Sequence, residues 1–305
     1  MKLSICIATY NRPNGLKRLL ESLNRIELPN NIVGFITICD NDFHRSAFPI
    51  VESVKKVIKF SVYYIVVEKR GIPIVRNALI KKSNELNADF VCFLDDDEYV
   101  PKDWLEKIFN KLESEKADVV FGPVIPVYEG KNNQKISQHI LSDYKNFKDN
   151  QFIKYGSTNN VIMRMSSINP FNIRFDERFI YQGGTDNLYF HRMNKFKLKK
   201  IWCSDAFVFE SVPESRQSMK WLIKRSFRSG ISISRTDFMQ GSISEKIVRL
   251  IKAIYNILVG SFKFILLSFT MQRYINSLCI ISRGVGMLTI FTGIQYNEYK
   301  TIHGN

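Results

Sequence analysis

Short apolar runs recur along the first hundred residues, and each one ends at a polar break. Between these runs the apolar residues recur at helical spacing, as Leu16, Leu19, Leu20 and Leu23 do. The runs themselves are apolar nearly throughout, as in strands that are covered on both faces. This alternation of strand and helix predicts an α/β fold with a mostly parallel central sheet. The predicted strands are residues 3–8, 35–39, 62–67 and 91–94, followed later by 118–122 and 206–209.

Polar side chains follow three of these strands, at Thr9, Asp40 and Asp95. The carboxyl ends of parallel strands lie at one edge of a sheet, where open α/β folds bind nucleotides. Asp95 also begins a run of four acids that ends at Glu98. Such close carboxylates repel one another unless cations balance them, and Mg²⁺ or Mn²⁺ prefers carboxylate and phosphate oxygens. The run predicts a site for a divalent cation and a phosphate-bearing ligand; the alternative is a solvated acidic loop that caps the next helix.

Two features of the second half point to further chemistry. The glycines Gly183 and Gly184 let the backbone approach another group closely, and Asp186 opens a predicted helix, as a reactive carboxylate or as a simple N-cap. Arg225 and Arg228 share one face of a later predicted helix. That face suits either solvent or a contact with phosphate or membrane.

The last part of the chain differs in kind. Residues 253–272 contain one charged residue, Lys263, and have about the length of a membrane-spanning helix. At helical spacing Lys252, Asn256 and Lys263 fall on one narrow face, with Arg249 close to it. A polar stripe on an apolar helix favours a helix that lies in the membrane interface. The alternatives are a helix that packs on the core, one that forms an oligomer contact and one that spans the membrane. A second apolar segment, 274–294, would pair with it as a helical hairpin.

Composition narrows the classes of partner. The chain has 305 residues and a formal net charge of +15, which suits nucleic acid, an anionic membrane surface or phosphorylated substrates. No nucleic-acid-binding motif accompanies the charge, so no nucleic-acid partner is expected. The five scattered cysteines resemble core residues in a reducing compartment. The first strand begins at Leu3 without a signal-peptide pattern, which predicts a cytoplasmic protein.

Several motifs follow one another in a specific order. They are Ala8-Thr9-Tyr10-Asn11-Arg12, Cys39-Asp40-Asn41, Gly71 with Arg76-Asn77-Ala78, Leu94-Asp95-Asp96-Asp97 and Gly183-Gly184-Thr185-Asp186. This series resembles glycosyltransferase family 2, whose members have the GT-A fold, use nucleotide sugars and transfer them with inversion. The resemblance covers about residues 1–235, which it predicts to be the catalytic domain. The tail, 236–305, is similar to the membrane-associated helices of some bacterial exopolysaccharide and capsule enzymes.

The resemblance implies a donor site in the first half of the chain. Asp40 would bind the base, Arg76 would lie near the nucleotide and Asp95 near the ribose. Asp97 would hold the Mn²⁺ or Mg²⁺ that bridges the diphosphate, and Glu210 stands close to where many relatives carry a metal-binding His. The implied nucleotide-binding residues are Thr9, Tyr10, Asn11, Arg12, Asp40, Arg76, Asp95 and Asp96, and the implied metal ligands are Asp97 and Glu210, with Asp96 as an alternative.

The resemblance also implies that Asp186 is the catalytic base. Relative to the family motif Gly-Gly-Glu-Asp, Thr185 replaces the Glu, and Leu188 replaces the acid two residues past the base. The candidate contacts to phosphate or acceptor are Gly184, Thr185, Arg216, Arg225 and Arg228.

The function implied is transfer of a sugar, with inversion, from a nucleotide diphosphate sugar to an acceptor hydroxyl. A UDP-sugar is the expected donor, and a lipid-linked glycan of cell-surface polysaccharide biosynthesis is the expected acceptor. The C-terminal helices would hold the enzyme peripherally on the inner face of the cell membrane. The alternatives are a polyprenyl-phosphate sugar synthase of the same fold and a non-catalytic nucleotide-sugar-binding protein.

Overall fold

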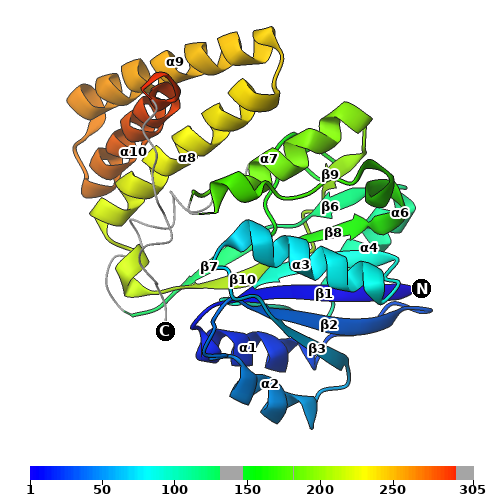
Figure 1. The fold of residues 1–305 in the computed structure, drawn as a ribbon. Helices are drawn as coiled ribbons and strands as arrows, with labels where there is room; N and C mark the ends of the chain where they lie inside the picture. Colours follow the sequence, from blue (N-terminus) through cyan, green and yellow to red (C-terminus); the bar gives the residue numbers. More distant parts are fainter. Residues whose placement is uncertain (131–146, 181, 293–305) are drawn as a thin grey trace.

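A computed structural model describes residues 1–130, 147–180 and 182–292 (Figure 1). Its centre is a seven-stranded sheet in the order β3-β2-β1-β4-β8-β6-β9. Strand β8 runs antiparallel to β4 and β6, and the other pairings are parallel, which confirms the predicted α/β fold with a mostly parallel sheet. The strands are β1 (Lys2–Thr9), β2 (Val33–Asp40), β3 (Ser61–Val66), β4 (Phe90–Asp95), β6 (Val119–Phe121), β8 (Val161–Arg164) and β9 (Lys200–Trp202).

Helices cover both faces of this sheet. Along β1, Ile5 and Ile7 pack with Leu16 in one buried cluster, whereas Cys6 packs with Val75 in the other. Burial on both faces explains why the strands are apolar without alternation. One face is covered by α1 (Pro13–Leu23), α2 (Phe48–Lys55) and α4 (Trp104–Ser114), and the other by α3 (Ile72–Glu85) and α7 (Thr185–Arg192).

A second, three-stranded sheet has the order β5-β10-β7. Its strands are β5 (Glu98–Tyr99), β7 (Val124–Tyr128) and β10 (Val208–Val212). β5 follows β4 closely and pairs antiparallel with β10, so that Glu98 lies opposite Glu210. The predicted strand at 206–209 was wrong in its bounds, because β10 begins at Val208 and continues through Glu210, which pairs with strands on both sides.

Three long helices end the described chain, namely α8 (Met219–Gln240), α9 (Ile243–Leu267) and α10 (Met271–Leu288). α10 packs against both α8 and α9, and α8 connects the pair to the rest of the fold through α7 (Figure 1). The two apolar C-terminal helices were predicted, although residues 293 and 294 of the second apolar segment lie outside the described residues. The boundary predicted at residue 235 falls inside the continuous helix α8. The short helices are α6 (Met165–Ile168), η2 (Asn169–Phe171), η3 (Glu177–Phe179), η4 (Met193–Phe196), η5 (Glu214–Arg216) and η6 (Thr289–Phe291).

The outer face of α9 is apolar and exposed. Ile251, Leu258 and Ile265 are 60%, 65% and 75% exposed. By length and composition, both α9 and the segment Met271–Phe291 are long and apolar enough to cross a membrane. Lys252 is exposed, whereas Arg249 is buried against α8 and does not join the exposed polar face.

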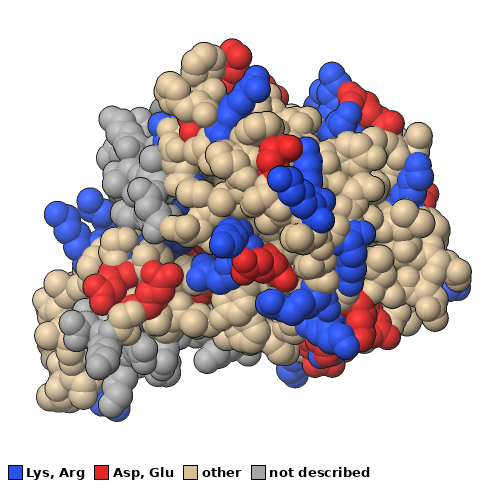
Figure 2. All heavy atoms as spheres, turned by 90° about the horizontal axis from the view of Figure 1, so that it is seen from below, with Lys and Arg blue, Asp and Glu red and all other residues tan. Residues whose placement is uncertain are grey.

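The positive charge of the protein does not form one patch on the face opposite the C-terminal helices. Figure 2 shows Lys and Arg side chains in several groups there, with Asp and Glu between them. On this face the described part of the chain therefore presents mixed charge.

Candidate active site

The carboxyl ends of β1, β2 and β4 meet at one edge of the main sheet. Thr9 is the register partner of Asp40 on β2, and Ala8 is the partner of Asp95 on β4. Thr9 Oγ1 also donates a hydrogen bond of 2.9 Å to Asp96 Oδ2. The structure therefore brings together the strand-end residues that the sequence had placed at one edge.

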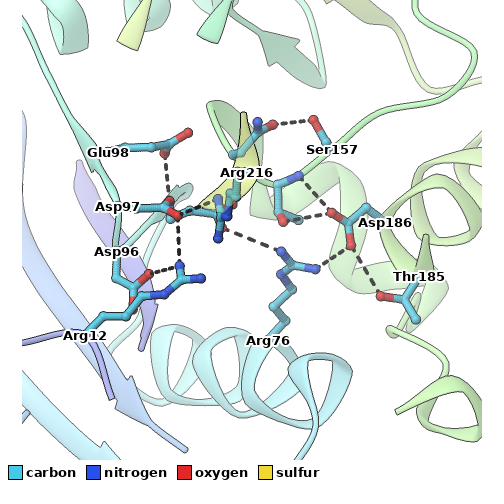
Figure 3. Close-up of polar contacts among 12 residues, drawn as sticks. Arg12, Arg76, Asp96, Asp97, Glu98, Ser157, Thr185, Asp186 and Arg216 are labelled. Atoms are coloured by element: carbon cyan, nitrogen blue, oxygen red, sulfur yellow. Dashed lines mark hydrogen bonds and ion pairs between the residues drawn. The ribbon is translucent and has the colours of Figure 1, made fainter. Parts of the chain in front are cut away.

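Two arginines from different elements bind the acidic run (Figure 3). Arg12, just before α1, donates from Nη1 to Asp96 Oδ1 at 2.9 Å and to Asp97 Oδ2 at 2.8 Å. Arg216, in η5, donates from Nη1 to the same Asp97 oxygen and to Glu210 Oε1, both at 3.2 Å. Asp97 is therefore the centre of the cluster, and a single guanidinium nitrogen joins it to Glu210.

Burial controls the electrostatics of these acids. The pKa of Asp95 is raised to about 7, because burial outweighs the attraction of Arg76. The pKa of Glu98 is raised well above its ordinary value by burial and then by the charge of Asp95. Glu98 accepts a hydrogen bond from the Asp95 amide through Oε2 at 2.8 Å, while its buried Oε1 has no hydrogen-bond partner among the described residues. Negative charge on these buried carboxylates is therefore unfavourable, and nearby cations stabilise it.

The donor set suits a hard divalent cation. Asp97 and Glu210 converge on one nitrogen of Arg216 and could present two carboxylates to a single ion. Mg²⁺ and Mn²⁺ are usually held by one or two carboxylates, and substrate phosphates and water complete the shell. Within residues 1–130, 147–180 and 182–292 no group of three or more His, Cys, Asp or Glu side chains is arranged to hold a metal. The role of Asp97 and Glu210 as metal ligands therefore stays a prediction.

Asp186 lies at the start of α7, and its carboxylate is held from three sides (Figure 3). Oδ2 accepts a hydrogen bond from Thr158 Oγ1 at 3.2 Å, and Oδ1 accepts one from Thr185 Oγ1 at 3.3 Å. Arg76 Nη1 forms a short ion pair with Oδ1. The hydroxyl of Thr185 thus contacts the carboxylate at the position where the family motif has Glu.

Arg76 connects the two halves of the site. Its Nη1 contacts Asp186, and its Nη2 lies 3.7 Å from Asp95 Oδ1. The side chain is buried, and its guanidinium carbon is 5.7 Å from the centre of the Phe175 ring. One buried cation therefore fixes the distance between the acidic run on β4 and the carboxylate on α7.

Asp40 is held by hydrogen bonds within the protein. The residue is fully buried, and its oxygens accept hydrogen bonds from the amides of Asp42 and Ala47 at 2.9 and 3.0 Å. Tyr64 Oη donates a third hydrogen bond at 2.8 Å. These contacts give Asp40 a structural role in the turn after β2, and its predicted contact with a base stays a prediction.

The remaining predicted residues lie after β1, on α8 and just before α7. Tyr10 lies under Arg70, whose guanidinium carbon is 4.2 Å from the ring centre, and Asn11 has a left-handed backbone with a φ of 51°. Arg225 stacks on Trp221 at 5.2 Å and contributes to the charge around Glu210. Arg228 lies one turn further along α8, and Gly184 precedes α7.

Sequence reasoning missed Thr158 as a member of the site, and it placed Glu98 in the acidic run without giving it a role of its own. Thr158 lies in the polar stretch before β8, and nothing in its local pattern marks it as a partner of Asp186. Glu98 had a local signal, since it ends the acidic run, but its place opposite Glu210 depends on the two-residue strand β5.

Comparison with solved structures defines the class of fold. The crystal structure of Staphylococcus aureus TarS 1-349 is similar with a TM-score of 0.56 and 17% identity, over 97% of this chain and 93% of that chain. The mannosyltransferase PcManGT from Pyrobaculum calidifontis, in complex with GDP-Man and Mn²⁺, is similar with a TM-score of 0.61 and 13% identity, over 94% and 86%. The protein therefore has the GT-A fold.

Sequence comparison places the chain within that class. The model of glycosyl transferase family 2 matches residues 4–174, so the chain belongs to this family and is a glycosyltransferase. The succinoglycan biosynthesis protein ExoM of Rhizobium meliloti is 30% identical over 230 residues, which are 75% of this chain and 73% of ExoM. The poly(ribitol-phosphate) beta-N-acetylglucosaminyltransferase TarS of Staphylococcus aureus is 25% identical over 122 residues, which are 39% of this chain and 20% of TarS.

Proposed function

We propose that this glycosyltransferase moves one sugar from a UDP-sugar to a hydroxyl of a lipid-linked glycan, with inversion, in the biosynthesis of a cell-surface polysaccharide. Similarity to ExoM supports the pathway class, and the structure of TarS 1-349 in complex with UDP-GlcNAc supports the donor class. The observation that carries the proposal is the position of Asp186. Its carboxylate lies across Arg76 from Asp95, so a base and a donor site would share one buried cation.

In the proposed reaction Asp186 acts as general base, and the acceptor hydroxyl must come within hydrogen-bond reach of it. The acceptor oxygen forms a bond to the anomeric carbon as the bond from that carbon to the diphosphate breaks. The electron pair leaves with the nucleoside diphosphate, and the hydroxyl proton passes to the carboxylate of Asp186. Attack from the face opposite the leaving group inverts the anomeric centre.

Arginines would stabilise the leaving diphosphate. Arg12 and Arg216 already lie at the acidic run. Burial and the charge of Asp97 raise the pKa of Glu210, and Arg225 is close enough to oppose this rise. Preorganised cations of this kind stabilise charge that develops in the transition state. A Mn²⁺ or Mg²⁺ ion held by Asp97 and Glu210 would add to this neutralisation.

A nucleotide-release assay tests the enzymatic proposal. The purified full chain would be given a panel of UDP-, GDP- and dTDP-sugars, with lipid extract as acceptor and with Mn²⁺, Mg²⁺ or EDTA. We expect UDP release that depends on metal and acceptor and that falls about 10²- to 10⁴-fold in Asp186→Asn. The exposed control Asp205→Asn should retain full activity. Metal-independent turnover would contradict the cation role, and full activity of Asp186→Asn would contradict the base assignment.

The identity of the product separates the alternatives. An extended oligosaccharide on lipid supports the proposal, whereas a lipid monophosphate sugar indicates a polyprenyl-phosphate sugar synthase. Tight binding of a UDP-sugar without turnover in the presence of lipid extract would indicate a non-catalytic binding protein.

We further propose that α9 lies on the inner, anionic face of the cell membrane. Its exposed apolar face, which includes Ile251, Leu258 and Ile265, would enter the lipid interface. The exposed lysines Lys252 and Lys263 would contact anionic headgroups, each adding about 1 kcal/mol. This position would bring the active site to a lipid-linked acceptor.

Vesicle flotation tests this placement. Wild-type protein should float with phosphatidylglycerol-containing vesicles, and the double variant Ile251→Asp/Leu258→Asp should not. The control Val57→Asp changes an apolar side chain on the catalytic domain that is at least as exposed, and this variant should float normally. Resistance of wild-type binding to alkaline carbonate extraction would indicate a spanning helix instead.

A further inference from the structure

The second half of α8 contacts the loop that leads into Asp186. Arg235 Nη2 donates a hydrogen bond of 2.8 Å to the carbonyl of Gly183, and its Nη1 forms a short hydrogen bond with Gln182 Oε1. The same guanidinium lies over the Phe179 ring, with its carbon 4.7 Å from the ring centre. The planar group therefore holds the loop at three places, immediately before the residue proposed as base.

A second contact shows how tightly helix and loop fit together. Gly184 has a φ of +86°, which L side chains rarely adopt. A Cβ at this position would lie 1.4 Å from Ser232 Oγ on α8. Asn187, in the first turn of α7, donates a hydrogen bond of 3.3 Å to the same Ser232 oxygen. The loop can pass α8 only with glycine here, so α8 determines the path of the backbone into Asp186.

α8 also contacts the second loop that holds Asp186. Tyr155 forms a short hydrogen bond with Asp237 on α8, and Thr158, three residues after Tyr155, binds the Asp186 carboxylate. Arg249 of α9 completes this contact, because it donates from Nε to Asp237 at 2.7 Å and from Nη2 to Tyr155 Oη at 3.2 Å. Both loops around the proposed base therefore depend on one stretch of α8.

The C-terminal hairpin fixes the position of that stretch. Ser234 Oγ donates a hydrogen bond of 2.8 Å to the carbonyl of Met287 on α10. A Cβ on Gly230 would lie 2.2 Å from the carbonyl oxygen of Arg283, so the two helices touch backbone to backbone. The hairpin of α9 and α10 therefore supports, through α8, the two loops around Asp186.

We propose that Arg235 is a positioning residue for glycosyl transfer, which sets the Gln182–Gly184 loop so that the Asp186 carboxylate faces the acceptor. The role rests on the proposed function of Asp186 as base. It also gives the C-terminal helices a part in catalysis besides any contact with a membrane, since they hold α8 in place. A displacement of about 1 Å at a catalytic group can cost on the order of 10²-fold in rate. Loss of Arg235 should therefore reduce kcat by about 10- to 100-fold, while leaving donor binding intact.

The test compares Arg235→Gln, Arg235→Lys and Arg273→Gln in the full chain. Arg273 is exposed at the start of α10 and provides a matched control. We expect Arg235→Gln to lower kcat about 10- to 100-fold with the Kd for UDP and the Tm close to wild type. Arg235→Lys keeps one donor for the Gly183 carbonyl and should recover part of kcat. Arg273→Gln should match wild type.

A double variant separates this inference from the proposed function. If Arg235 acts through Asp186, Arg235→Gln should add little to the loss already caused by Asp186→Asn. Wild-type kcat in Arg235→Gln, or parallel loss of Tm, UDP binding and kcat, would overturn the positioning role. Full activity of Asp186→Asn would instead refute the base assignment itself. An additive loss in the double variant would show that Arg235 acts elsewhere.

Discussion

The ion pair between Arg249 and Asp237 should be the most sensitive point of the junction between α9 and α8. The two side chains are 9% and 2% exposed, and Arg249 Nε lies 2.7 Å from Asp237 Oδ2. Arg249→Met leaves the Asp237 carboxylate buried with Tyr155 as its remaining side-chain partner. Removing one member of a buried pair costs about 3–5 kcal/mol, because the other charge stays buried and uncompensated. At roughly 2 °C per kcal/mol for a chain of this size, we expect a fall in Tm of about 6–10 °C.

Denaturation in mild detergent, followed by circular dichroism, would measure this loss. Replacing both partners by apolar residues is often nearly neutral, so Arg249→Met/Asp237→Leu should recover most of the loss. The control Lys252→Met removes an exposed cation from the same helix and should change the free energy of unfolding by less than about 0.5 kcal/mol. The reasoning fails if the free energy of unfolding of Arg249→Met is within about 1 kcal/mol of the wild-type value, or if the double variant is no more stable than Arg249→Met.

Three further predictions concern backbone strain and pH. Gly184→Ala should lower both kcat and Tm, because the alanine would have a φ of +86° and its Cβ would clash with Ser232. Ser232→Gly in the same chain removes the clash but not the unfavourable φ, so it should restore only part of kcat and Tm. Burial lowers the pKa of Lys200 from 10.5 to about 7, so between pH 7 and 10.5 the side chain is protonated in the unfolded chain but not in the folded one. Urea titrations should therefore show the free energy of unfolding of the wild type rising over this pH range relative to that of Lys200→Met. The hydrogen bond from Lys154 is the largest cause that lowers the pKa of Glu245 from 4.5 to about 2. Wild-type protein should therefore be more stable than Lys154→Met above pH 4.5, and this difference in the free energy of unfolding should disappear as the pH falls to about 2 and Glu245 is protonated.

The sequence predicted the central sheet well, because burial on both faces leaves a strong local pattern. The runs at 3–8, 35–39, 62–67 and 91–94 coincide with the cores of β1 to β4. The second sheet could not be predicted in the same way. β5 has two residues and therefore no period, and β10 carries Glu210 in its middle, where a polar residue suggested the end of a strand.

In the site, too, features with a local sequence pattern could be predicted, whereas contacts between distant parts of the chain could not. The turn residues Gly184 and Asp186 could be found because a left-handed glycine and a helix start are local features. The supports of Asp186 could not, since only the tertiary fold brings them together. Arg76 was predicted near the nucleotide and not at Asp186, and Thr158 and Arg235 were not predicted at all. Helical spacing likewise placed Arg249 beside the polar face of α9, whereas its true partner is Asp237 on the preceding helix.

The acidic run at the end of β4 is tolerated because arginines join its carboxylates in pairs. Arg12 joins Asp96 to Asp97, and Arg216 joins Asp97 to Glu210. Arg76 does the same across the site for Asp95 and Asp186. Each cation therefore offsets the repulsion between two acids that burial would otherwise make severe. In the proposed donor site the same guanidinium groups would face the diphosphate, so the residues that make the run compatible with folding would also bind the nucleotide sugar.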